Sequence, residues 1–172
     1  MTINPRDPQQ IVFTRYAYDT TGQLAESLNW LDIRVRAAIP LAPADQAMRQ
    51  AAFSPDGQEL AFVQREGASE NLFVASLVVA NGQPQLNDAH QVVSGVIAQP
   101  AWRPDGFALA YLELSHGRYQ LLSVERGQPG NSDFGKPRQL TSGAELDATS
   151  RPIWLSGTAA STARQWFERE AQ

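Results

Sequence analysis

The stretch AFSPDGQELAFV (residues 52–63) aligns without a gap with AWRPDGFALAYL (residues 101–112), at an offset of 49 residues. In both copies an aromatic residue is followed, two positions later, by Pro-Asp-Gly and then by a short apolar run. Proline fixes φ at about −65° and glycine accepts a positive φ, so each copy is predicted to form a strand, a tight turn and a second strand. Short β-rich runs that recur at this spacing are typical of propeller blades.

The repeat extends beyond these two copies in both directions. Residues 11–14 match the pattern of residues 60–63 at the same offset, with residues 6–8 in the place of the Pro-Asp-Gly turn. Toward the C-terminus the pattern of residues 99–102 returns 52 positions later as Arg151, Pro152, Ile153 and Trp154. We therefore predict blades of four antiparallel strands, with repeats at about 3–48, 49–97 and 98–148 and a closing strand at 150–155.

The two ends of the chain are complementary in this interpretation. We expect the first repeat to lack its innermost strand, because no apolar stretch precedes Asn4, whereas the last repeat keeps only that strand. An open arc of three blades would expose sheet faces and strand edges to aggregation. We therefore expect two copies to close a six-bladed ring, with Arg151 to Trp154 of each filling the inner position of the other's first blade. The alternative is a fragment of a longer propeller.

The two clear copies of the motif resemble the repeat of TolB-type β-propellers, and the resemblance covers about residues 3–155. It implies an all-β fold of propeller blades, of which TolB proteins have six and this chain about half, and it implies binding to other proteins. Similar repeats occur in propellers attached to prolyl-oligopeptidase-like enzymes. We predict a propeller domain at 1–157 and a short C-terminal helix at 158–172 that packs on a blade edge or on the second copy; a docking peptide for another protein is the alternative.

Composition excludes several classes of protein. The net charge is −4, from 14 basic and 18 acidic residues, which argues against a nucleic-acid partner. No apolar run approaches the roughly 18 residues of a membrane span, and no signal peptide is evident. We expect a cytoplasmic protein, or a periplasmic or extracellular one if a leader was trimmed. The absence of cysteine excludes disulfides and cysteine-ligated zinc.

Catalytic residues are not evident in the sequence. His90 and His116 are the only histidines, and neither has a second metal ligand at a suitable spacing. The sequence has no Gly-x-Ser-x-Gly motif and no glycine-rich phosphate loop before a helix. Turn geometry accounts for the repeated residues Pro55, Asp56, Gly57, Pro104, Asp105 and Gly106. We expect no enzymatic activity, no cofactor and no metal; the alternative is the propeller of a peptidase-like or carbohydrate-processing enzyme whose catalytic region is absent.

Polar residues recur at one position of the predicted inner strands: Gln50, Gln99 and Arg151, with Arg49 beside the first. Propellers usually bind ligands at the channel mouth, where these residues would converge. Two symmetry-related copies of Arg151 would suit an anionic group or a peptide carboxylate. The alternative is that these side chains only hydrate the channel. We therefore expect a binding or scaffold module that forms a homodimer and binds a protein or peptide.

Overall fold

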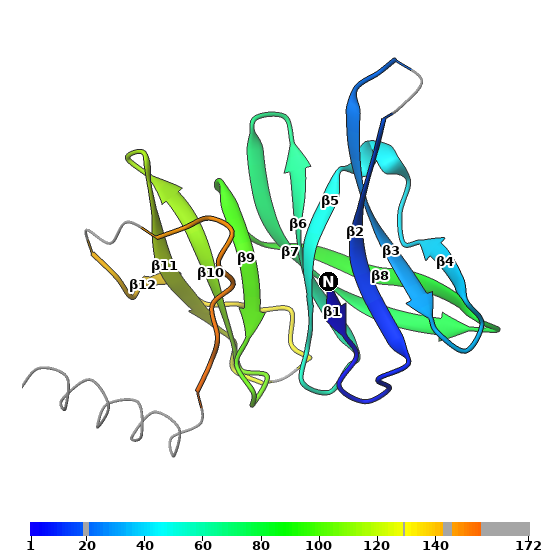
Figure 1. Cartoon of the computed structure of the whole chain (residues 1–172). Coiled ribbons are helices and arrows are strands. Elements are labelled where there is room, and N and C mark those ends of the chain that lie inside the picture. Colours follow the sequence, from blue (N-terminus) through cyan, green and yellow to red (C-terminus); the bar gives the residue numbers. More distant parts are fainter. Residues whose placement is uncertain (19–20, 129, 143–145, 156–172) are drawn as a thin grey trace, which may run out of the picture.

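The computed structural model describes residues 1–18, 21–128, 130–142 and 146–155. These residues form three four-stranded antiparallel sheets that lie side by side (Figure 1). Blade 1 contains β1 (Thr2–Ile3), β2 (Gln10–Tyr18), β3 (Leu24–Asp32) and β4 (Ala37–Pro40). Blade 2 contains β5 (Met48–Phe53), β6 (Glu59–Glu66), β7 (Ser69–Ala80) and β8 (Gln83–Val93). Blade 3 contains β9 (Ile97–Trp102), β10 (Ala108–Ser115), β11 (Arg118–Glu125) and β12 (Arg138–Gln139).

This architecture confirms the predicted all-β class and the four antiparallel strands of each blade. A short 3-10 helix, Ala44–Gln46, precedes β5. The helix expected at 158–172 lies outside the described residues.

The strand register repeats the 49-residue offset of the sequence. In blade 2, Phe53 pairs with Leu60, and in blade 3, Trp102 pairs with Leu109. The Gly57 amide donates to the carbonyl of Ser54 at 2.9 Å, and in blade 3 the equivalent turn from residue 103 to residue 106 closes at the same distance. Both turn glycines have a positive φ, of 70° and 76°, which an L side chain rarely adopts. Equivalent backbone bonds therefore build equivalent turns.

The core consists of two apolar clusters, one on each side of blade 2. Leu60 and Phe62 belong to the cluster shared with blade 1, whereas Ala61 and Val63 belong to the cluster shared with blade 3. Alternate residues of a strand point to opposite faces of the sheet. Because both faces of blade 2 are covered, β6 has an unbroken apolar run instead of an alternating one.

The prediction that the first blade lacks an inner strand is wrong. Thr2 and Ile3 form β1 and pair with Val12 and Ile11 of β2. The strand was not predicted because it has only two residues, of which only Ile3 is apolar. Its turn is also one residue longer than in blade 2, since the Asn4 amide bonds to the carbonyl six residues on instead of five. The offset of the inner strand is therefore 50 instead of 49.

The last described segment, residues 150–155, runs beside blade 3 without forming a β-ladder. The indole N–H of Trp154 donates to the carbonyl of Ala101 at 3.1 Å. One blade earlier, the indole N–H of Trp102 donates to the carbonyl of Ala52 at 3.2 Å. Ala52 and Ala101 are equivalent in the repeat, so Trp154 lies against blade 3 as Trp102 of β9 lies against blade 2.

Candidate functional site: the inner strands and the turns between blades

Gln50 and Gln99 connect the inner strands of successive blades. Each has a positive φ, of 52° and 54°, and the pairing of its strand with the next is interrupted by a bulge there. A bulge frees backbone groups from the ladder, and buried ones must find other partners. The Gln50 amide donates to Oγ1 of Thr14 in blade 1, and the Gln99 amide donates to Oε1 of Gln50. Both residues lie on the inner strands, as predicted, but their polar groups form hydrogen bonds to neighbouring blades.

Arg49 lies beside Gln50 in a charge network that joins blades 1 and 2. Its guanidinium contacts Glu70 at 2.5 Å and Glu26 at 3.6 Å. Arg65 contacts the same two carboxylates, Glu26 at 3.3 Å and Glu70 at 3.7 Å. Two arginines and two glutamates balance in charge, so Arg49 is committed to holding blades together and is not a free cation for a ligand. Sequence periodicity gave no indication of these partners.

Arg151 differs from Arg49 because none of the described carboxylates forms an ion pair with it. It is half-buried, and one terminal nitrogen donates to the carbonyl of Ala51 on β5 at 2.8 Å. Burial lowers the pKa of the Arg151 guanidinium from its ordinary value, because leaving water disfavours the charged form. Its charge also lowers the pKa of the Met1 amino group, after the larger effect of burial. The guanidinium has five donors, and a single hydrogen bond leaves most of them for a ligand.

A pocket of about 250 Å³ adjoins Arg151 on the outer side of blade 3. Its walls are mainly apolar and include Leu112, Leu121 and Leu146. Asp147 also lines it, but its carboxylate accepts hydrogen bonds from the backbone and hydroxyl of Thr149, which lower the pKa of Asp147. Residues 151–154 therefore place a cation beside an apolar hollow.

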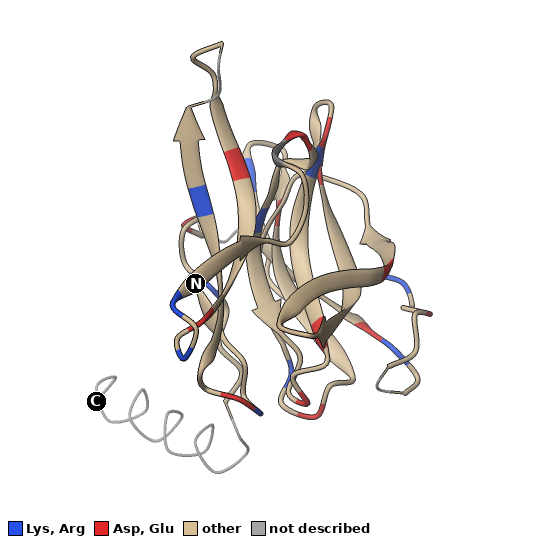
Figure 2. Ribbon diagram, turned by 90° about the vertical axis from the view of Figure 1, so that its right-hand side faces the viewer, with Lys and Arg blue, Asp and Glu red and all other residues tan. Residues whose placement is uncertain are grey.

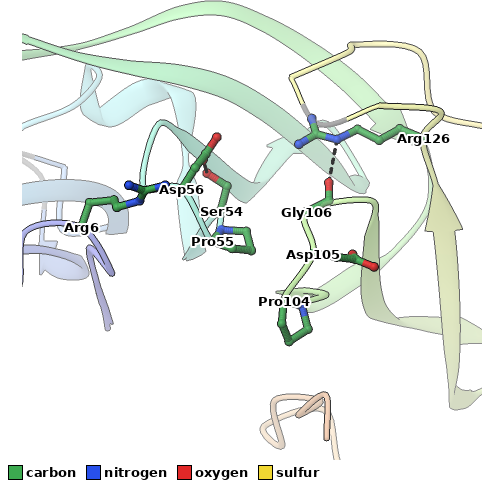
Figure 3. Close-up of a pocket in the computed structure, with 8 residues that line it drawn as sticks. All are labelled: Arg6, Ser54, Pro55, Asp56, Pro104, Asp105, Gly106 and Arg126. Carbon is green, nitrogen blue, oxygen red and sulfur yellow. Dashed lines mark hydrogen bonds between the residues drawn. The ribbon is translucent and has the colours of Figure 1, made fainter. Parts of the chain in front are cut away.

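A second pocket, of about 320 Å³, lies between the turns of blades 2 and 3 (Figure 3). It is lined by Arg6, Ser54, Pro55, Asp56, Pro104, Asp105, Gly106 and Arg126. Asp56 accepts hydrogen bonds from the Ser54 hydroxyl and the Gln58 amide, within its own turn. Asp105 does the same with the Phe107 amide and is also bound by Arg103, whose hydrogen bonds hold the pKa of Asp105 below its usual range. Both aspartates are thus engaged by their own turns.

Elsewhere, charge is distributed without a concentration of one sign. Figure 2 shows acidic and basic segments interspersed, mostly in loops and at strand ends. Nδ1 of His90 lies 3.2 Å from the carbonyl of Asp88, and Nδ1 of His116 lies 2.9 Å from the hydroxyl of Ser115. Within the described parts of the chain, no three potential metal ligands gather, and no helix has the length and apolar character needed to cross a bilayer.

Comparison with known proteins gives matches at the level of structure. No protein-family model matches the sequence, and a search of curated proteins finds no match. A crystal structure of TolB from Acinetobacter baumannii aligns with a TM-score of 0.58 and 17% identity, over 81% of this chain and 31% of that one. A TolB candidate from Agrobacterium tumefaciens aligns with a TM-score of 0.58 and 11% identity, over 81% of this chain and 47% of that one.

The fold is that of a partial TolB-like β-propeller. This confirms the resemblance carried by the Pro-Asp-Gly repeats. At such low identity the likeness concerns the fold alone, and the chain spans less than half of either solved structure.

The contacts of Arg126 in this TolB-like structure were not predicted from the sequence. Arg126, which directly follows β11, is buried against blade 2 and binds both carboxylate oxygens of Glu59, at 2.7 and 3.0 Å. Its Nε donates to the Gly106 carbonyl (Figure 3). Its guanidinium lies 4.6 Å from the ring centre of Trp102. A comparison of the repeats could have found the pair, because Glu59 and Arg126 are charged whereas the equivalent residues 49 positions earlier, Gln10 and Leu77, are neutral.

Proposed function

We propose that this chain is a non-enzymatic binding module, which completes a six-bladed TolB-like ring by pairing with a second copy and binds a protein or peptide at the channel mouth. The proposal rests chiefly on the outer face of blade 1. Its residues repeat a pattern that is fully buried wherever another blade covers it.

Equivalent side chains in the three blades make this point. Leu60 and Phe62 of blade 2 face blade 1 and are 0% exposed, and Leu109 and Tyr111 of blade 3 face blade 2 and are also 0% exposed. The equivalent residues of blade 1, 49 positions earlier, are Ile11 and Phe13, which remain partly exposed. A sheet face that is apolar in all three repeats, and uncovered in one, is suited to a further blade.

The opposite end of the arc offers a complementary surface. Ile153 is 82% exposed, and Leu114 and Leu155 are also exposed on the outer side of blade 3. In a cyclic arrangement the free face of blade 1 meets the free side of blade 3 of the second copy, and the two-fold axis generates the same contact twice. No apolar end of the arc then remains in water.

Ligand binding is assigned to Arg151. In a ring of two copies, two half-buried guanidinium groups without an acidic partner lie at the channel mouth. Arginine binds carboxylates through paired hydrogen bonds, so a peptide with a free carboxylate offers the complementary group.

The mass in solution tests the ring. Light scattering is expected to give twice 18.9 kDa for the wild type. Phe13→Arg, which places a charge on the free face of blade 1, is expected to give the single mass while circular dichroism stays unchanged. Tyr18→Arg is the control, because Tyr18 is 77% exposed and lies on the other face of β2. A wild-type mass of 18.9 kDa would overturn ring closure and favour a fragment of a longer propeller.

Binding is tested separately with short peptides of mixed sequence that end in either a free carboxylate or a carboxamide. The wild type is expected to prefer the carboxylate series, and Arg151→Gln is expected to lose that preference without a change in mass. Equal binding of both series by the wild type would remove the assigned role of Arg151.

A further inference from the structure

Two segments of this chain correspond to the same position of a propeller blade. Ile3 pairs with Ile11 as Phe53 pairs with Leu60, so Ile3 occupies the Phe53 position of blade 1. Trp154 lies against blade 3 as Trp102 lies against blade 2, through the same indole-to-carbonyl hydrogen bond. Trp154 therefore marks the inner strand of the blade that follows blade 3. In a ring of two copies, that blade is blade 1 of the second copy.

The present occupant, β1, fills this position only in part. In blade 2 the inner strand continues beyond its bulge, where Arg49 pairs with Val63 and Met48 with Gln64. The equivalent residues of β2 in blade 1 are Thr14 and Arg15, and β1 pairs only with the two residues at 11 and 12. Among the residues that the structure describes, positions 14 and 15 of β2 therefore have no ladder partner on the β1 side, and an open strand edge favours association with another chain.

The segment before Trp154 has the length that β1 lacks. At the offset of 52 residues, Thr149 and Ser150 are equivalent to Ile97 and Ala98, which continue the inner strand of blade 3 beyond its bulge. Ile153 is equivalent to Ala101, which is 7% exposed, whereas Ile153 itself is 82% exposed. Pro152, Ile153 and Trp154 therefore repeat the pattern of an inner strand, with Thr149 and Ser150 at the positions that continue it, but they lack the neighbouring strand that would bury Ile153.

We propose that the ring closes by strand exchange: residues 149–154 of one copy add to the inner edge of β2 of the second copy and displace Thr2–Ile3. This proposal rests on the pairing with a second copy proposed above, and it identifies the contact that makes the pair. In the single chain, β1 covers part of the β2 edge. In the pair, the exchanged segment covers the edge fully, and the two-fold axis repeats the exchange at the other junction.

A disulfide that fixes β1 in place tests the displacement. The chain has no cysteine, so Ile3→Cys with Ile11→Cys introduces a single possible pair. Because the adjacent Asn4 amide bonds to the Gln10 carbonyl, Ile3 and Ile11 form a pair without mutual backbone hydrogen bonds. Such pairs have Cα atoms about 4.5 Å apart, within the range of about 4.4 to 6.8 Å that a disulfide spans.

The oxidised double variant is expected to lose the dimer, and the same protein after reduction is expected to regain it. The reduced form is the matched control, because it has the same side chains on the same face. An oxidised variant that remains dimeric would overturn the exchange while leaving ring closure intact. A wild type and a reduced variant that are both monomeric would overturn the ring, and with it the exchange.

A second variant tests the incoming strand. Residues 103 and 108 are hydrogen-bonded, so by alternation Ala101, two positions earlier, is hydrogen-bonded too, and its equivalent Ile153 is expected to donate its amide to β2 of the second copy. Ile153→Pro removes that donor and is expected to abolish the dimer, whereas Ile153→Thr keeps the donor and the dimer. A dimer of unchanged affinity in Ile153→Pro would overturn the proposal.

Discussion

Arg126→Leu is expected to destabilise this protein more than the loss of any exposed arginine. The Arg126 side chain is 1% exposed, and that of its partner Glu59 is 10% exposed. The substitution removes the bidentate contact with Glu59, the hydrogen bond to the Gly106 carbonyl and the contact with the Trp102 ring. It also leaves the Glu59 carboxylate between blades 2 and 3 without its cation.

Removing one partner of a buried ion pair costs about 3–5 kcal/mol, because the other charge stays buried. Arg126→Leu is therefore expected to lower the free energy of unfolding by an amount in this range.

Urea unfolding at fixed protein concentration measures this loss. The control is the double variant Arg126→Leu with Glu59→Gln, which introduces the residue types found 49 positions earlier, Leu77 and Gln10. The double variant is expected to recover more than half of the loss. A single variant within about 1 kcal/mol of the wild type would refute the reasoning.

Three further outcomes follow from individual contacts. In urea unfolding, Gly57→Ala is expected to lower the free energy of unfolding more than Gly67→Ala. Both glycines have a positive φ, which costs an alanine about 1 kcal/mol, but only at Gly57 does the new methyl group collide with the turn of blade 1. Tyr111→Phe is expected to keep or raise stability, by up to about 1–2 kcal/mol, because the buried Tyr111 hydroxyl has no hydrogen-bond partner; a comparable loss would show a missed bond. In an NMR titration Asp105 is expected to have a pKa below about 3.9, so its contribution to stability is present above that pH and is lost as the pH falls through the folded value. Arg103→Gln is expected to raise this pKa, because it removes the hydrogen bonds that lower it. An unchanged titration midpoint in Arg103→Gln would contradict this prediction.

The sequence predicted the blades well because each blade is built from local signals. The turn at Gly57 and the apolar run that follows it lie within one short stretch, and the same stretch recurs 49 residues later. An exact repeat of spacing must give the same register when the turn length is constant. The repeat did not predict Thr2–Ile3 as a strand, because the turn that follows is one residue longer and the strand is too short to show a pattern.

The candidate site was less predictable because its properties depend on residues distant in the sequence. Periodicity placed Arg49 on an inner strand, but only the folded chain brings Glu26 and Glu70 to its guanidinium. The pairing of Arg126 with Glu59 spans 67 residues and has no counterpart in the other repeats. Spacing reveals what the blades share, whereas individual charges and their partners are what distinguish one interface from the next.

The contacts between blades follow the same translation as the sequence. Gln99 donates its amide to Gln50, and the indole donors of Trp102 and Trp154 reach carbonyl groups that are themselves one repeat apart. Contacts of this kind can continue through any number of blades, because each blade contacts the next through the same type of surface with which it contacts the previous one. The chain nevertheless contains two inner-strand segments for one junction, Thr2–Ile3 and residues 149–154. A ring of two identical chains has to choose between them at each junction, and the longer segment offers more backbone hydrogen bonds and buries Ile153. The same choice brings Arg151 of each copy to the channel mouth, so closure of the ring and formation of the ligand site are expected to be one event.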